Sequence, residues 1–133
     1  MSEATAAAQV AAEIRVLIVD DEPLFVEMVE AMLACEQGIV VVGTADHGKD
    51  GVDAAQRLHP DVVVMDISMP VMNGIDATRE IRTQNPDACV LILTGGSNIG
   101  EVDEARKAGA AAYLTKDRIA SDLVAEIRSL GGR

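Results

Sequence analysis

The stretch that decides the fold is Val62-Val63-Val64-Met65-Asp66, an apolar run that ends on a carboxylate. A continuous run of this kind, rich in Val and without polar alternation, is typical of a strand buried on both faces, as in parallel sheets. Four other runs share this character: Val16–Val19, Ile39–Val42, Cys89–Leu93 and Ala111–Leu114. Together the five runs predict a parallel five-stranded sheet.

Amphipathic segments of helical spacing lie between and after these runs. One stripe consists of Leu24, Phe25, Met28, Val29, Met32 and Leu33, and another of Ile119, Leu123, Ile127 and Leu130. Weaker helical stretches cover residues 51–58, 75–81 and 102–108. Strands that alternate with single crossover helices, connected with right-handed topology, predict an α/β fold: a three-layer (βα)₅ sandwich.

The length of 133 residues suits one domain, which we place at residues 14–130. Residues 1–13 form an alanine-rich extension that is expected to be frayed or weakly helical, and residues 131–133 form a C-terminal tail. The extension has no basic start and no long apolar core, so it predicts neither a signal peptide nor a membrane anchor. We therefore expect a cytoplasmic protein that does not bind membranes.

The charge balance argues against nucleic acid as a direct ligand. The net charge is −11, and Phe25 and Tyr113 are the only aromatic residues. An acidic surface repels phosphate backbones, and the chain lacks a row of rings on which bases could stack.

Cysteines and histidines show no pattern of a redox or metal site. Cys35 and Cys89 have no metal or redox spacing, and Cys89 is expected to be a small buried apolar residue. His47 and His59 are isolated in the sequence, which gives a histidine metal site no support.

Polar residues follow the predicted strands at the points where these end. The first strand is followed by Asp20, Asp21 and Glu22, the third by Asp66, the fourth by Thr94 and the fifth, at a short distance, by Lys116. Each has an ordinary explanation when taken alone, such as a helix cap, a turn or a surface charge. Because the carboxyl ends of parallel strands open onto one edge, these side chains should converge there.

Converging carboxylates require a counter-charge. Two of them about 5 Å apart repel by roughly 3 kcal/mol at an effective dielectric constant near 20. Such a group must take up protons, form ion pairs or bind a cation, and hard oxygen ligands suit Mg²⁺. A metal, an ammonium and a hydroxyl around a carboxylate predict a phosphoryl-transfer site.

The same residues carry a family resemblance. The chain resembles the receiver domain of bacterial response regulators, and most closely the subgroup that carries a C-terminal helix-turn-helix, from about Ile14 to Leu130. The resemblance rests on four blocks in matching order: Ile18–Asp21, Pro60–Pro70 with Asn73-Gly74, Leu91–Gly95, and Gly109–Lys116.

The resemblance implies a flavodoxin-like receiver fold with strand order 2-1-3-4-5. It also implies that Asp66 is the phosphoacceptor and that Asp21, Asp66 and the Ser68 backbone carbonyl ligate Mg²⁺, with Asp20 acting through a metal-bound water. Thr94 would hydrogen-bond the phosphoryl group and Lys116 would contact it. Thr94 and Tyr113 would be the switch residues.

The implied function is a two-component phosphorelay. A sensor histidine kinase or a phosphotransfer protein would donate the phosphoryl group, and the changed conformation would control an output domain, a partner or a homodimer, often in transcription regulation. The chain would be no enzyme beyond its own phosphorylation and dephosphorylation at Asp66.

Two features depart from the family pattern. Asp117 follows Lys116 where many members have proline, which leaves the geometry of that loop open. Gly95, Gly96 and Gly100 suggest that the fourth helix starts late or is mobile.

Three other functions remain to be weighed. A Mg²⁺-dependent aspartyl-phosphate phosphatase would need an acid two residues after its nucleophile, where this chain has Ser68. An FMN carrier would need a phosphate-cradling loop where Asp20, Asp21 and Glu22 stand. A binding module that is never phosphorylated has the acids, Thr94 and Lys116 against it, but these residues do not exclude it.

Overall fold

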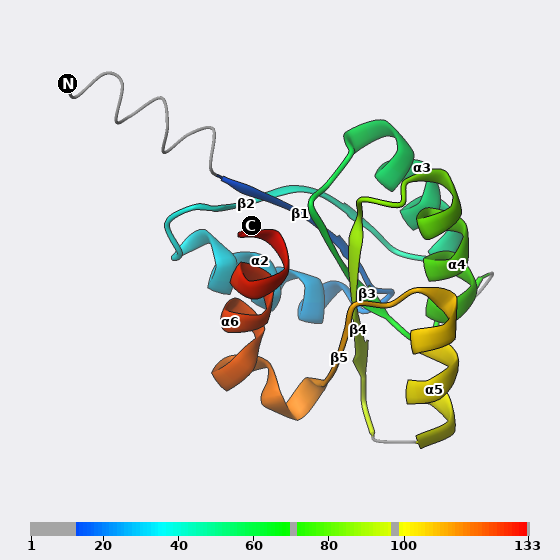
Figure 1. Ribbon diagram of the computed structural model, residues 1–133. Helices are drawn as coiled ribbons and strands as arrows, with labels where there is room; N and C mark the ends of the chain where they lie inside the picture. Colours follow the sequence, from blue (N-terminus) through cyan, green and yellow to red (C-terminus); the bar gives the residue numbers. More distant parts are fainter. Residues whose placement is uncertain (1–12, 70–71, 97–98, 133) are drawn as a thin grey trace.

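The computed structural model describes residues 13–69, 72–96 and 99–132. Predictions about residues 1–12, Pro70 and Arg133 lie outside this part of the chain. Helices and strands alternate, as Figure 1 shows, and its labels are used below. The strands are β1 (Ile14–Val19), β2 (Ile39–Ala45), β3 (Val62–Asp66), β4 (Cys89–Thr94) and β5 (Ala112–Thr115). The helices are α2 (Pro23–Ala34), α3 (Gly48–Leu58), α4 (Gly74–Gln84), α5 (Ile99–Ala108) and α6 (Ile119–Gly131), with a 3₁₀ turn η1 (Lys116–Arg118) before α6.

The five strands form one parallel sheet in the order β2-β1-β3-β4-β5. The predicted architecture and strand order are therefore confirmed. The strand order changes direction between β1 and β3: the chain passes from β1 to β2 on one side and then returns to β3 on the other side of β1. Ligands of open parallel sheets bind at such a point. Val19 of β1 pairs with Met65 of β3, so the next residues, Asp20 and Asp66, lie side by side.

The apolar run of β3 explains the three layers. Val62 and Val64 belong to a core shared with α2 and α6, and Val63 and Met65 belong to a second core under α3, α4 and α5. Figure 1 shows these two groups of helices on opposite sides of the sheet. All four side chains are fully buried, and each contributes about 1.5 to 3 kcal/mol to stability.

The stripe predicted for α2 is wider than the face that the helix buries. Val29 and Leu33 are fully buried, whereas Leu24 is 80% exposed and Met28 is 50% exposed. At 100° per residue, Leu24 lies about 140° around the helix from Val29, which turns it away from the sheet. The prediction that Leu24 and Met28 are part of the buried stripe is therefore wrong.

The structure differs from the sequence predictions at three other places. Helix α5 begins at Ile99 with Gly100 in its first turn, so the expected late start is wrong. Cys89 is half-buried rather than buried, with its Sγ 3.7 Å from the Leu130 carbonyl oxygen. The loop after β5, whose geometry the sequence left open, forms the 3₁₀ turn that contains Asp117.

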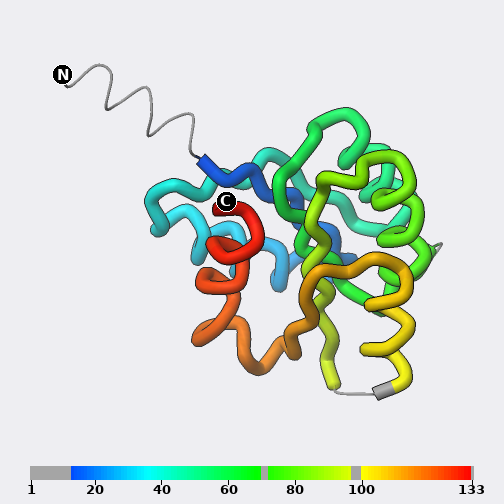
Figure 2. Tube along the Cα trace, viewed as in Figure 1, coloured from blue at the N-terminus to red at the C-terminus, as the bar shows by residue number. Residues whose placement is uncertain are grey.

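The two ends of the domain meet at one end of the sheet, as the chain trace in Figure 2 shows. A Cβ atom on Gly131 would lie 2.5 Å from Cγ2 of Ile14, so α6 packs tightly against the start of β1. Over the described residues, no helix combines the length and the apolar character that crossing a bilayer requires.

Helix α4 begins directly beside the carboxyl end of β3. Asn73 caps it, because its side-chain oxygen accepts a hydrogen bond of 2.9 Å from the backbone N–H of Asp76. A Cβ atom on Gly74 would collide with the backbone carbonyl of Asp66. The absence of a side chain at Gly74 therefore lets α4 approach the strand end that carries Asp66.

Candidate functional site

Three carboxylates meet where β1 and β3 end. Asp20 follows β1, Asp66 is the last residue of β3, and each of Asp20, Asp21 and Asp66 offers an oxygen within 4.8 Å of the other two. Asp20 and Asp66 are buried, with 2% and 5% of their surfaces exposed, whereas Asp21 is exposed. The predicted convergence of these three acids is a feature of the structure.

Burial and the neighbouring negative charges raise the pKa of Asp66. Burial, and then the charge of Asp20, raise the pKa of Asp66 from 3.8 to about 6, although the nearby Lys116 opposes the rise. The charge of Asp21 adds a smaller upward effect. A carboxylate in this setting is stabilised by any cation that reaches it.

Lys116, which directly follows the edge strand β5, supplies a positive charge to the site. Its Nζ lies 3.0 Å from Asp20 Oδ2, 3.0 Å from Glu22 Oε1 and 3.5 Å from Asp66 Oδ1. Burial by itself lowers the pKa of Lys116, but its close contacts with Asp20 and Glu22 and the charge of Asp66 outweigh this and raise the pKa above its ordinary value. Lys116 is therefore a permanent cation of the site.

The three acids fit a hard divalent cation. Asp20 Oδ2 is buried and has no hydrogen-bond partner among the described residues, although the Lys116 ammonium lies close enough for an ion pair. One ammonium also leaves three carboxylates incompletely neutralised. Clustered carboxylate oxygens are the donors that Mg²⁺ prefers, so the donor set suits that ion.

Thr94 and Tyr113 lie on the two strands beyond β3. Thr94 ends β4 and is buried, and its Oγ1 accepts a long hydrogen bond of 3.4 Å from the Gly96 N–H. Tyr113 in β5 is half-buried, packs against the core under α3, α4 and α5, and has a buried hydroxyl without a hydrogen-bond partner among the described residues. Thr94 pairs with Thr115, the residue before Lys116, so β4 and β5 end at the same level.

Ser68 lies in the loop that follows β3. It is exposed and shares a hollow with Asp21 and Asn73. The predicted site residues therefore come from the ends of β1, β3, β4 and β5, all at one edge of the sheet.

Glu22 and Phe25 both contact Lys116. The sequence placed Glu22 among the converging acids without naming it as a site residue, and it assigned no role in the site to Phe25. Glu22 accepts a hydrogen bond of 3.0 Å from Lys116 Nζ, and the Phe25 ring centroid lies 4.2 Å from the same nitrogen. A cation at this distance is attracted by the ring face. The signal in the sequence was weak, because Glu22 stands among other acids and Phe25 was assigned to an apolar stripe.

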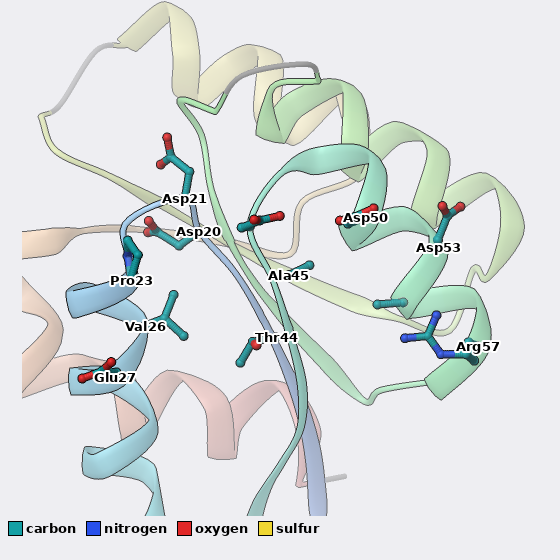
Figure 3. A pocket seen from close by; sticks show the side chains of 12 residues that line it. Asp20, Asp21, Pro23, Val26, Glu27, Thr44, Ala45, Asp50, Asp53 and Arg57 are labelled. Carbon is teal, nitrogen blue, oxygen red and sulfur yellow. The ribbon is translucent and has the colours of Figure 1, made fainter.

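A hollow lies beside the carboxylates rather than over Asp66. It has a volume of about 700 Å³ and is lined by α2, the end of β2 and α3, with Asp20 and Asp21 at one end. Figure 3 shows Glu27, Asp50 and Asp53 around it, with Arg57 at the base of α3. Because neither Asp66 nor Lys116 lines it, we place the chemistry at the carboxylate cluster and not in this hollow.

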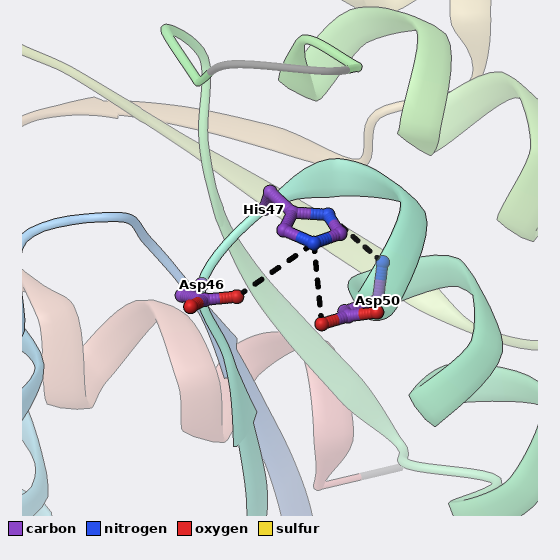
Figure 4. A group of neighbouring side chains, drawn as sticks. All are labelled: Asp46, His47 and Asp50. Atoms are coloured by element: carbon purple, nitrogen blue, oxygen red, sulfur yellow. Dashed lines mark hydrogen bonds and ion pairs between the residues drawn. The ribbon is translucent and has the colours of Figure 1, made fainter.

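A second cluster consists of Asp46, His47 and Asp50, so His47 is not isolated in space as it is in the sequence (Figure 4). His47 caps α3, because its Nδ1 accepts a hydrogen bond of 3.3 Å from the Asp50 N–H. An unprotonated Nδ1 places the proton of the neutral ring on Nε2, which lies 3.2 Å from Asp50 Oδ2. Nε2 then has no lone pair for a metal, and the cluster is a helix cap.

Fold and site together define a class: an α/β sandwich with a cluster of carboxylates and a lysine at the point where the strand order reverses. The family model of the response regulator receiver domain matches residues 16–128. The chain belongs to this family.

Several similar proteins are named as transcriptional regulatory proteins. The chain is 36% identical to the transcriptional regulatory protein DegU of Brevibacillus brevis over 87% of this chain and 49% of that protein. It is 41% identical to the transcriptional regulatory protein PdtaR of Mycobacterium tuberculosis over 96% of this chain and 61% of that protein. The chain thus spans about half to three-fifths of the length of these relatives.

The solved structures agree with this family. A LuxR-family two-component response regulator from Aurantimonas sp. SI85-9A1 has a TM-score of 0.85 and 34% identity, with 91% of this chain and 87% of that chain covered. The receiver domain of the response regulator NarL from Mycobacterium tuberculosis has a TM-score of 0.84 and 32% identity, with 91% and 98% covered.

Proposed function

We propose that this chain is a phosphorylated receiver, in which Asp66 accepts a phosphoryl group and the resulting change of conformation controls an output partner or domain. The observation that carries the proposal is the burial of Asp66 between two acids and the Lys116 ammonium. The printed names of several relatives, among them the response regulator GacA of Pseudomonas aeruginosa, support the signalling role.

In the proposed chemistry, a carboxylate oxygen of Asp66 attacks the phosphorus atom of the donor. The bond between phosphorus and the donor nitrogen or oxygen breaks, its electron pair leaves with the donor, and an acyl phosphate remains on Asp66. The pKa of Asp66 near 6 leaves most of this carboxyl ionised at neutral pH, as a nucleophile must be. Lys116 is placed to neutralise the incoming phosphoryl oxygens, because its Nζ already lies 3.5 Å from Asp66 Oδ1.

The metal assignment belongs to the same proposal. Asp21, Asp66 and the Ser68 carbonyl would hold Mg²⁺ directly, and Asp20 would reach it through a water molecule. The ion would supply positive charge against the phosphoryl oxygens. Thr94 would donate a hydrogen bond to the phosphoryl group, and Tyr113 would respond to the movement of Thr94.

The donor would be a sensor histidine kinase or a phosphotransfer protein. Such partners, and any output domain or second copy of the chain, are part of the proposal, because the relatives extend well beyond the region they share with this chain. A cytoplasmic location follows from the same role.

Incubation with acetyl phosphate and Mg²⁺ tests the phosphoacceptor. Intact-mass measurement should show one phosphoryl group, which hydroxylamine removes because it is an acyl phosphate. Asp66→Asn should abolish the modification and EDTA should prevent it, whereas Asp61→Asn, in the loop before β3, should leave it unchanged. Phosphate uptake that persists in Asp66→Asn would overturn the assignment.

A further inference from the structure

The ammonium of Lys116 has more acceptors around it than protons to share once Asp66 is phosphorylated. An ammonium has three N–H donors, and here three carboxylate oxygens, from Asp20, Glu22 and Asp66, lie within 3.5 Å of Nζ. A phosphoryl group would bring three further acceptor oxygens and about two negative charges. The Asp66 contact is replaced when this carboxylate becomes the acyl phosphate, and the phosphoryl oxygens then compete with Asp20 and Glu22 for the same three N–H donors.

Exposure decides which acceptor leaves. The Asp20 side chain is 1% exposed, so release from Lys116 would leave a buried carboxylate without its cation. The Glu22 side chain is 65% exposed, so water can hydrate its carboxylate as soon as it turns away. The release of Glu22 from Lys116 is therefore less costly than the release of Asp20.

The backbone around Glu22 permits this movement. Glu22 precedes α2 at the capping position but makes no side-chain capping bond, and its own N–H is anchored by a hydrogen bond of 2.9 Å to Asp20 Oδ1. The side chain can therefore rotate while the backbone of the loop stays in place. The Phe25 ring, three residues further on, also contacts the ammonium, with its centroid 4.2 Å from Nζ.

We propose that Glu22 is a positioning residue that competes with the phosphoryl group for Lys116 and releases the ammonium when Asp66 is phosphorylated. This inference rests on the proposed function, and it adds a movement at the start of α2 to the one expected at Thr94 and Tyr113.

The first test measures the affinity for beryllofluoride, a phosphoryl analogue, by NMR titration of the full chain in saturating Mg²⁺. Glu22→Gln removes the competing charge, so its Kd should be about two- to five-fold lower than that of the parent protein. Glu27→Gln is the matched control, because Glu27 is exposed on α2, the helix that follows Glu22, and is not an ion-pair partner of Lys116. A Glu22→Gln affinity equal to or weaker than the parent's, or an equal gain in Glu27→Gln, would overturn the competition.

The second test needs no substitution. The side-chain carboxyl ¹³C resonance of Glu22 in the parent protein should move toward that of Glu27 when beryllofluoride and Mg²⁺ are added, because both carboxylates are then hydrated. An unmoved Glu22 resonance in the beryllofluoride-bound protein would refute the release. If the parent binds no beryllofluoride, the proposed function itself fails and this inference falls with it. If the parent binds beryllofluoride but Glu22→Gln has the same affinity as Glu27→Gln, or the Glu22 resonance does not move, only this inference fails.

Discussion

Lys116 and Asp20 form an ion pair of 3.0 Å between Nζ and Oδ2, although one follows the last strand of the chain and the other the first. Two strands, β3 and β4, separate β1 from β5 in the sheet. From the turn after β5, the Lys116 ammonium therefore reaches both Asp66 at the end of β3 and Asp20 after β1. This ion pair couples the start and the end of the domain through the site.

Removal of that cation should destabilise the metal-free protein. In Lys116→Met, the buried carboxylates of Asp20 and Asp66 lose their partner, which should reduce the free energy of unfolding by about 1 to 3 kcal/mol. Urea unfolding in EDTA at pH 7 measures it. Lys107→Met is the control, because the Lys107 ion pair with Asp103 is largely exposed and should contribute less than about 1 kcal/mol. Equal effects of the two substitutions would contradict the structural importance of the Lys116 pair.

Mg²⁺ should stabilise the fold through Asp21. If the ion binds only the native state, a concentration of 100 times its Kd should add about 2.7 kcal/mol to the free energy of unfolding. Asp21→Ala should raise the metal-free stability, because it relieves repulsion, and should lose most of the response to Mg²⁺. Asp46→Ala alters the second cluster and should keep the full response. Melting curves that respond equally to Mg²⁺ in the parent and in Asp21→Ala would exclude an Asp21 site.

Because the pKa of Asp66 is raised in the folded state, this residue makes the metal-free protein less stable as the pH rises, the opposite of an ion-paired carboxylate with a lowered pKa. Between its ordinary pKa of 3.8 and about 6, the folded state holds a proton that the unfolded chain releases. Asp66 therefore destabilises the fold increasingly as the pH rises through this window, by about 2 to 3 kcal/mol at its upper end.

Asp66→Asn removes that dependence. Its stability relative to the parent should increase from pH 4 to pH 7 in EDTA, as measured by urea unfolding at each pH. A difference between the two proteins that stays constant over this range would show that the Asp66 carboxyl has an ordinary pKa.

Thr94 should couple phosphorylation to conformation without being needed for the chemistry. A hydrogen bond to a charged acceptor contributes roughly 1.5 to 3 kcal/mol, which shifts a two-state equilibrium by about 10- to 150-fold. Thr94→Ala should still accept phosphate on Asp66 but should show much smaller NMR shift changes around Tyr113 on addition of beryllofluoride and Mg²⁺. Thr94→Ser retains the hydroxyl and should restore the response. A full response in Thr94→Ala would disprove this coupling.

Gly74 and Gly95 should differ sharply in their tolerance of a side chain. Alanine at Gly74 would collide with the Asp66 carbonyl, so Gly74→Ala should destabilise the protein by about 2 kcal/mol or more and disturb the site. No heavy atom lies within 4 Å of a Cβ atom on Gly95, so Gly95→Ala should change stability by less than about 1 kcal/mol. Thermal unfolding of the two variants makes the comparison, and similar losses would contradict the close approach of α4 to β3.

The order of the elements and the chemistry-bearing positions were predictable from the sequence, because they depend on local patterns. The apolar run at Val62–Met65 marks a strand buried on both faces whatever surrounds it, and a carboxylate directly after such a run must lie at the edge of the sheet. The same reasoning placed Asp20, Thr94 and Lys116 at that edge. Their mutual positions needed only the rule that parallel strands end together.

Tertiary packing decided what the local pattern left open. Leu24 has the spacing of a buried residue, but the angle at which α2 meets the sheet turns it to solvent. The contacts of Lys116 with Glu22 and Phe25 depend on how the turn after β5 and the start of α2 are placed in the fold, and no spacing in the sequence encodes that placement. The pKa of Asp66 likewise depends on how completely its neighbours exclude water, which is a property of the packed domain and not of the residues around Asp66 in the chain.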